Sequence, residues 1–186
     1  WLRAISCMTI VVPADPTETA AAVRWAASYD GPVFLRVSRT PVPAIHEKSY
    51  EFVPGRSVRL RDGGDVTLVA NGTVLWRAIA AADLLATEGI SARVLSMASV
   101  KPLDVDAIVA AARETGAIVT VEEAIATGGL GGAVAETVVT EHPVPMAMLG
   151  FRGFCTTGPS AYLIDKAGMS PEGIAEAARR VIARKR

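Results

Sequence analysis

Residues 66–97 read VTLVANGTVLWRAIAAADLLATEGISARVLSM, and this stretch decides the fold class. Its first five residues, 66–70, form a short apolar run of the kind found in buried parallel strands. The segment 72–89 is rich in alanine and leucine and predicts a helix, and 90–97 predicts a second strand. Strands that alternate with helices of this length predict an open, mostly parallel α/β sheet covered on both faces.

The same alternation continues towards the C-terminus. Gly116 stands at the end of a predicted helix, where glycine is the favoured stop, and Ser170 with Pro171 predicts the start of the last helix. The remaining predicted elements are strands at 117–123 and 144–150 and a helix at 131–142. We therefore expect a three-layer α/β domain.

A similar unit lies near the N-terminus. MTIVV at 8–12 and VFLRV at 33–37 predict strands, with a helix up to Ser28 between them. Asp15 is suited to cap that helix, Pro16 fits its first position, and Glu18 stands three residues after the cap, as in a capping box. Such a strand–helix–strand crossover is nearly always right-handed.

The stretch between the two regions is rich in proline, glycine and charge, and shows little periodicity. It predicts a linker that holds at most one short extended segment. We place the domain boundaries accordingly: residues 1–43 form the end of a parallel-sheet domain, 44–64 the linker, and 65–186 the second domain.

Composition excludes several classes of protein. The 186 residues include 19 basic and 19 acidic side chains and no basic stripe, which argues against nucleic-acid binding. No apolar run approaches the ~20 residues that cross a membrane. Cys7 and Cys155 form neither a disulfide framework nor a zinc pattern, so we expect a reducing cytoplasm. His46 and His142 have no second metal ligand nearby in the sequence, and we expect no metal site.

The glycine-rich loop EEAIATGGLGGAVAE, residues 122–136, invites comparison with phosphate-binding loops. Val134 stands where a dinucleotide fingerprint would continue to its third glycine, and no Lys-Ser or Lys-Thr pair follows as in a P-loop. We interpret the glycines as a tight strand-to-helix corner. Glu122 and Glu123 end the preceding strand and point to opposite faces, so at most one faces a ligand crevice, while the other is solvated or caps a helix.

Arg36 and Arg39 lie at the C-terminal end of the predicted strand 33–37, which is where ligands bind to an open parallel sheet. Arginine is well shaped to bind phosphate through two hydrogen bonds. A surface ion pair is an equally good explanation from the residues alone. No serine, threonine or cysteine has a visible activating base, because the two histidines stand apart in the sequence.

The order of these segments resembles the C-terminal half of the transketolase family, in particular the C-terminal subunit of a split transketolase encoded as two polypeptides. The resemblance covers nearly the whole chain. It is carried by LRAISC through SRTPVP (2–43), DVTLVANGT (65–73), VLSMASVKPLD (94–104), IVTVEEAIATGGLGGAVAE (118–136) and AGMSPEGI (167–174).

The resemblance implies an enzyme that uses thiamine diphosphate and Mg²⁺ to transfer a two-carbon ketol unit between sugar phosphates. Residues 1–43 would then be the end of the pyrimidine-binding domain, and Arg39 would bind the substrate phosphate. The implied partners are an N-terminal transketolase subunit and a second copy of this chain, in an α2β2 assembly.

Other features of the family are missing from this sequence. The GDG-and-Asn motif for diphosphate and metal has no match, and the glutamate that activates the cofactor belongs upstream. We therefore expect no catalytic, cofactor-binding or metal-binding residue in this chain, which we take to be a fragment or to lack an upstream part. Ala124 stands where the family usually has histidine.

Two alternatives remain open. One is a related thiamine enzyme, similar to deoxyxylulose-phosphate synthase or to the β subunit of a 2-oxoacid dehydrogenase. The other is a non-catalytic assembly subunit.

Overall fold

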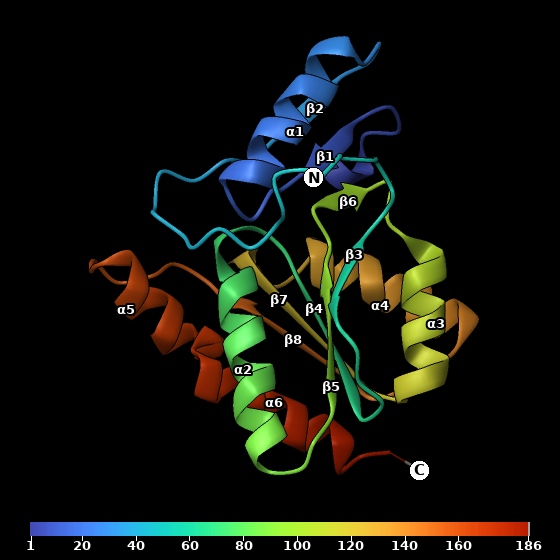
Figure 1. Cartoon of the computed structure of the whole chain (residues 1–186), viewed down its shortest axis with the longest axis vertical. Coiled ribbons are helices and arrows are strands. Elements are labelled where there is room, and N and C mark those ends of the chain that lie inside the picture. Colours follow the sequence, from blue (N-terminus) through green and yellow to red (C-terminus); the bar gives the residue numbers. More distant parts are fainter. Residues whose placement is uncertain (186) are drawn as a thin grey trace.

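Two β-sheets organise the chain, which the computed structural model describes over residues 1–185 (Figure 1). The small sheet has the strand order β2 (Val33–Leu35), β1 (Thr9–Val11), β6 (Ser99–Lys101). The large sheet has the order β3 (Val58–Arg61), β5 (Ala92–Ser96), β4 (Val66–Ala70), β7 (Ile118–Ile125), β8 (Met146–Phe151). Neighbouring strands are parallel except for two pairs, β1 with β6 and β3 with β5.

Helices cover both faces of the large sheet (Figure 1). One apolar cluster joins the sheet to α2 (Leu75–Thr87) and α6 (Pro171–Ile182), and a second joins it to α3 (Val105–Thr115) and α4 (Leu130–Glu141). The central strand β4 is buried along its whole length, as its apolar sequence predicts. The predicted three-layer α/β domain is confirmed.

The short elements connect these layers. The 3₁₀ turn η1 (Leu2–Ala4) precedes β1, and η2 (Gly72–Val74) leads into α2. Between β8 and α6 lie the short helix α5 (Ser160–Ile164) and the irregular turn η3 (Asp165–Met169), which kinks at Gly168.

Several helix ends follow the sequence signals. The helix α1 (Pro16–Ser28) begins at Asp15, whose side chain accepts a hydrogen bond from the Glu18 N–H at 2.8 Å. Gly116 ends α3 in the left-handed conformation, with φ of 64°. Ser170 caps α6 by accepting from the Gly173 N–H. These three predictions are confirmed.

The small sheet is packed differently on its two faces. On one face Val11, Val33 and Leu35 pack with α1 and with Phe52. On the other face Ile10 and Val12 pack with Val100 of β6 and with residues near the N-terminus. The small sheet therefore takes its strands from two separate parts of the sequence, β1 and β2 near the N-terminus and β6 in the middle of the chain.

Two strands were not assigned from the sequence. β3 is the short extended segment allowed for in the stretch 44–64, but it lies in the large sheet beside β5. β6 follows β5 closely and pairs with β1 in the small sheet. The boundaries at residues 43 and 65 stay a prediction, because each sheet takes a strand from beyond them.

Candidate functional site

The carboxyl ends of β1, β2, β4 and β7 meet where the two sheets join, and Arg36, Glu122 and Glu123 line the hollows at this junction. Gly72 donates its N–H to the Val12 carbonyl at 3.2 Å, and Val12 donates its own to Ala98 at 2.8 Å. The end of β1 is therefore fixed to the ends of both β4 and β5. Ligands of open α/β sheets bind at such carboxyl ends.

The buried side chain of Glu122 binds the N-terminus of α4. It is 3% exposed, and its two carboxylate oxygens accept the N–H groups of Leu130 and Gly131, each at 2.9 Å. These are the donors that would hold a phosphate at a helix N-terminus. The prediction that the glycine loop is a structural corner is thus confirmed, because a side chain of the same chain satisfies the helix end.

Glu123 points to the opposite face, as the strand alternation predicts. Its carboxylate accepts a hydrogen bond from the Thr73 hydroxyl of η2. It lines a hollow of about 150 Å³ together with Arg36, Ser38 and Thr73. Glu122 does not line this hollow.

Arg36 lies between the two glutamates. It lines the hollow with Glu123 on one side and, on the other, a second hollow of about 150 Å³ with Glu122 and Ala124. Burial lowers the pKa of its guanidinium, and the two glutamates oppose that shift. Arg36 therefore has carboxylates of its own chain as electrostatic partners, which weakens the case for it as a phosphate ligand.

Arg39 lies four residues beyond the end of β2 and is exposed to solvent. Within residues 1–185 its side chain has no hydrogen-bond or ion-pair partner. The loop that carries it starts where Arg36 donates its N–H to the Val11 carbonyl, at 2.9 Å. Of the two arginines, Arg39 is thus the one available to an external anion.

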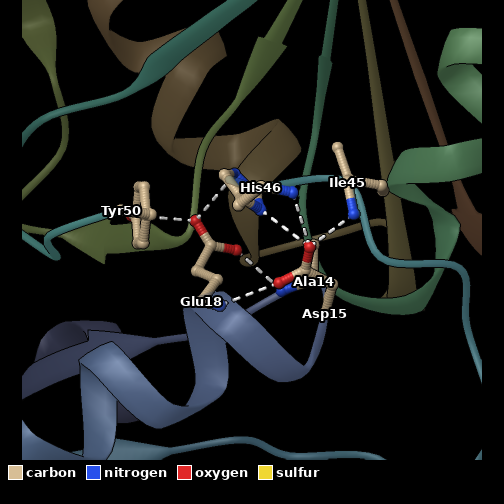
Figure 2. A network of polar contacts seen from close by, with 6 residues as sticks. All are labelled: Ala14, Asp15, Glu18, Ile45, His46 and Tyr50. Atoms are coloured by element: carbon tan, nitrogen blue, oxygen red, sulfur yellow. Dashed lines mark hydrogen bonds and ion pairs between the residues drawn. The ribbon is translucent and has the colours of Figure 1, made fainter. Parts of the chain in front are cut away.

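His46 is not isolated, and the sequence-based expectation was wrong on this point. Its side chain is 1% exposed and lies between the carboxylate of Asp15, the N-cap residue of α1, and that of Glu18, in the first turn of α1 (Figure 2). Nδ1 is 3.2 Å from Asp15 Oδ2, and Nε2 is 3.4 Å from Glu18 Oε1. The residues are about 30 positions apart in the chain and meet because the segment after Arg39 folds back over the start of α1.

Backbone and phenol donors complete this cluster (Figure 2). Asp15 Oδ2 accepts the N–H groups of Ile45 and His46, at 2.6 and 2.7 Å. Glu18 accepts the Ala14 N–H at 2.7 Å and the hydroxyl of Tyr50 at 3.0 Å. Glu18 thus reaches one residue further back than a capping box requires.

The ionisation of the two carboxyls is shifted in opposite directions. Burial acts to raise the pKa of Asp15, but the N–H donors of Glu18, His46 and Ile45 outweigh it and leave the pKa below its ordinary value. Burial raises the pKa of Glu18, and the neighbouring His46 ring only partly opposes this. Burial and the adjacent Glu18 also raise the pKa of the Tyr50 hydroxyl, which stays a hydrogen-bond donor.

Three observations bear on metal and cofactor binding within residues 1–185. No group of three or more His, Cys, Asp and Glu side chains among them is arranged to hold a metal ion. The one glycine-rich helix start is filled by Glu122. Both cysteines are free and exposed. In the same part of the chain, no helix has the length and apolar character to cross a bilayer.

The fold and the sequence together define a class. Residues 55–174 match the family described as "Transketolase, C-terminal domain", which is well over half of the chain. The chain belongs to the transketolase C-terminal domain family.

Particular relatives are subunits of split enzymes. The chain is 40% identical to the 6-deoxy-6-sulfo-D-fructose transketolase subunit SqwH of Clostridium sp. (strain MSTE9), over 99% of this chain and 58% of that protein. It is 42% identical to a subunit of the apulose-4-phosphate transketolase of Phocaeicola vulgatus, over 95% of this chain and 57% of that protein. The chain thus spans less than three fifths of the length of these relatives.

A solved structure agrees in both fold and sequence. It is described as a split gene transketolase, inactive beta4 tetramer, and matches with a TM-score of 0.95 and 40% identity. The match covers all of this chain and 60% of that one. The fold and the recognition from sequence are therefore confirmed together.

Proposed function

We propose that this chain is the C-terminal part of a split transketolase subunit, which acts with an N-terminal partner subunit to transfer a two-carbon ketol unit between sugars. The observation that carries the proposal is the match to split transketolase subunits along nearly the whole chain, at 40–42% identity. The split-gene structure, with its TM-score of 0.95, supports the same assignment.

We further propose that the substrate carries an anionic group and that Arg39 binds it. The names of two relatives differ on that group, since one includes a sulfonated sugar and the other a sugar phosphate. Both groups present several acceptor oxygens, which a guanidinium can bind through two hydrogen bonds. Arg39 is exposed beyond the end of β2 without a carboxylate partner in the described chain, which supports this role.

The cofactor part of the proposal follows from the family alone. Thiamine diphosphate with Mg²⁺ supplies the chemistry that breaks and forms the carbon–carbon bonds. We propose that parts outside this chain bind it, because the helix start that resembles a phosphate loop here is occupied by Glu122. Arg39 would bind and orient the sugar, and the chain would contribute no catalytic residue.

Assembly and location complete the proposal. The relative from Phocaeicola is named as one subunit of its transketolase, and the solved structure is a beta4 tetramer. We propose that the protein containing this chain pairs with a second copy of itself and with the N-terminal subunit, as α2β2, in the cytoplasm.

Reconstitution tests the function directly. The intact subunit would be mixed with its N-terminal partner, thiamine diphosphate and Mg²⁺, and assayed for ketol transfer from ketose phosphates and ketose sulfonates. We expect turnover that needs both subunits. A complex that forms and binds the cofactor, yet transfers from no donor, would support the non-catalytic assembly subunit instead.

A further inference from the structure

The surroundings of the His46 ring determine how many protons it and the two neighbouring acids hold between them. Nδ1 and Nε2 lie within ion-pair distance of carboxylate oxygens, Asp15 Oδ2 at 3.2 Å and Glu18 Oε1 at 3.4 Å, although neither contact has hydrogen-bond geometry (Figure 2). A neutral imidazole has one N–H and one lone pair, and an ionised carboxylate only accepts. With both acids ionised and the ring neutral, two buried negative charges would lie close together without a positive charge to balance them. One additional proton removes that repulsion.

The surroundings offer no other positive charge to the two carboxylates. The titratable groups that face His46 are Asp15 and Glu18 from the start of α1 and Tyr50 from its own segment. Tyr50 donates to Glu18 and is held in its protonated form. Among the described residues, no lysine or arginine forms an ion pair with either acid. The balancing proton must therefore reside on His46 or on Glu18.

The cluster also closes the loop that carries Arg39. That loop leaves β2 where the Arg36 N–H binds the Val11 carbonyl at 2.9 Å. It returns where the Ile45 N–H binds Asp15 Oδ2 at 2.6 Å. Both anchors belong to the same β1–α1 corner. The second anchor depends on the Asp15 carboxylate, which His46 contacts through its backbone and its ring.

We propose that Asp15, Glu18 and His46 form a proton-held clasp, which binds one proton shared between His46 and Glu18 and thereby positions the loop that carries Arg39. In this role His46 and Glu18 are positioning residues. The link to Arg39 rests on the proposed function, whereas the clasp itself does not.

The proton count fixes the direction of the pH effect. A folded state that binds one proton more than the open state loses the clasp as the pH rises, by up to about tenfold in the opening equilibrium per pH unit. The raised pKa of Glu18, caused by burial, has the same sign. The shared proton is a property of His46 and Glu18 together, because two groups in such close contact titrate as a pair.

Amide hydrogen exchange of the intact protein tests the clasp without any substrate. The reporters are the Ile45 and His46 N–H groups, because both donate to Asp15. Above about pH 6.5, where an ordinary histidine in the open state loses its proton, their protection factors, corrected for intrinsic exchange, should fall by up to about tenfold per pH unit. Protection factors that stay constant with pH in the wild type would overturn the proposal.

Two variants separate proton binding from simple packing. Glu18→Gln removes one of the two negative charges without an added proton, so both amides should stay protected and lose their pH dependence. His46→Gln should lower the protection and also remove the pH dependence. His142→Gln, a change at an exposed histidine, should behave like the wild type. A Glu18→Gln variant that keeps the wild-type pH dependence would contradict the shared proton.

Kinetics of the reconstituted complex test the positioning role. The ratio of the wild-type KM for the anionic sugar to the KM of Glu18→Gln should rise with pH. The kcat values of the two proteins should change with pH in the same way. A substrate phosphate loses its second proton at about pH 6, but this affects the KM of both proteins equally and so cancels in the ratio of their KM values. If exchange shows the clasp but this KM ratio is constant, the positioning role is wrong. If Arg39→Ala leaves KM unchanged, it is the proposed role of Arg39 that fails, and the exchange data still decide the clasp.

Discussion

Glu122 and Gly129 occupy adjoining space so closely that residue 129 has no room for a side chain. A Cβ atom at position 129 would stand 2.7 Å from the Glu122 carboxyl carbon, well inside van der Waals contact. The same carboxylate binds the first free N–H groups of α4. Glycine is thus needed at position 129 because the Glu122 carboxylate fills the space beside it. That carboxylate takes the place that a phosphate would occupy, so the loop resembles a phosphate site without being one.

Gly129→Ala should displace the Glu122 carboxylate from α4. The loss of a buried, charged hydrogen-bonding contact should lower the free energy of unfolding by about 1–3 kcal/mol. Urea unfolding measures this. Gly64→Ala is a matched control, because a Cβ there meets nothing within 4 Å, and it should change stability by less than about 0.5 kcal/mol. Equal effects of the two changes would refute the explanation.

Glu122→Ala should remove the cap of α4 while leaving the rest of the corner intact. Loss of a helix N-cap costs about 0.5–2 kcal/mol. We expect lower stability and faster exchange of the Leu130 and Gly131 N–H groups, which NMR can follow. Glu141→Ala, at the exposed far end of the same helix, should leave those two amides unchanged. Unchanged exchange in Glu122→Ala would show that water replaces the carboxylate at no cost.

Asp15→Asn should destabilise the protein at neutral pH and lose its effect in acid. Both carboxylate oxygens of Asp15 accept hydrogen bonds, one from the Glu18 N–H and the other from those of Ile45 and His46. The asparagine side chain has one acceptor oxygen, so we expect the free energy of unfolding at neutral pH to fall by about 1–3 kcal/mol. The pKa of Asp15 is lowered in the fold, so its contribution is present above the ordinary value of 3.8 and disappears as the pH falls through the folded value.

The measurement is urea unfolding of both proteins at a series of pH values. Their difference in unfolding free energy should shrink as the pH drops below 3.8. Asp30→Asn, on an exposed turn, serves as the control and should follow the wild type throughout. A difference that does not depend on pH would mean that the carboxylate charge of Asp15 does not matter.

Arg39→Ala should weaken transfer to and from anionic sugars. Charged hydrogen bonds contribute about 1.5–3 kcal/mol, so kcat/KM should fall by about tenfold or more, mainly through KM. Sugars without the phosphate or sulfonate should be used about as well as by the wild type. Arg24→Ala, at an exposed position of α1, is the matched control. An equal loss with neutral sugars would remove the anion-binding role.

Much of the fold could be predicted from the sequence because its signals are local. The strand 66–70 is found at those residues, and the caps at Asp15 and Ser170 act within three residues of themselves. β6 was missed because it has three residues, Ser99–Lys101, and its strand character depends on β1, about 90 positions away.

The candidate site shows the same limit more sharply. The alternation of Glu122 and Glu123 is a property of one strand, and it was predicted correctly. The cluster around His46 was not, since its members come from α1 and from a stretch without periodicity. Only the folded chain brings a histidine and two acids together there, and no spacing rule relates them.

The return of the chain through β6 has a consequence for how such proteins are divided. The polypeptide enters the small sheet, moves to the large one, goes back to the small one and ends in the large one. A cut within residues 44–64 would therefore not release two independent modules, because the downstream piece would still carry the strand that completes its neighbour. In a chimaera, β1 and β6 should therefore come from the same parent, because they pair with each other. A chimaera joined at the start of the C-terminal domain would separate them, so it should need sequences on the two sides of the joint that are compatible at this pairing.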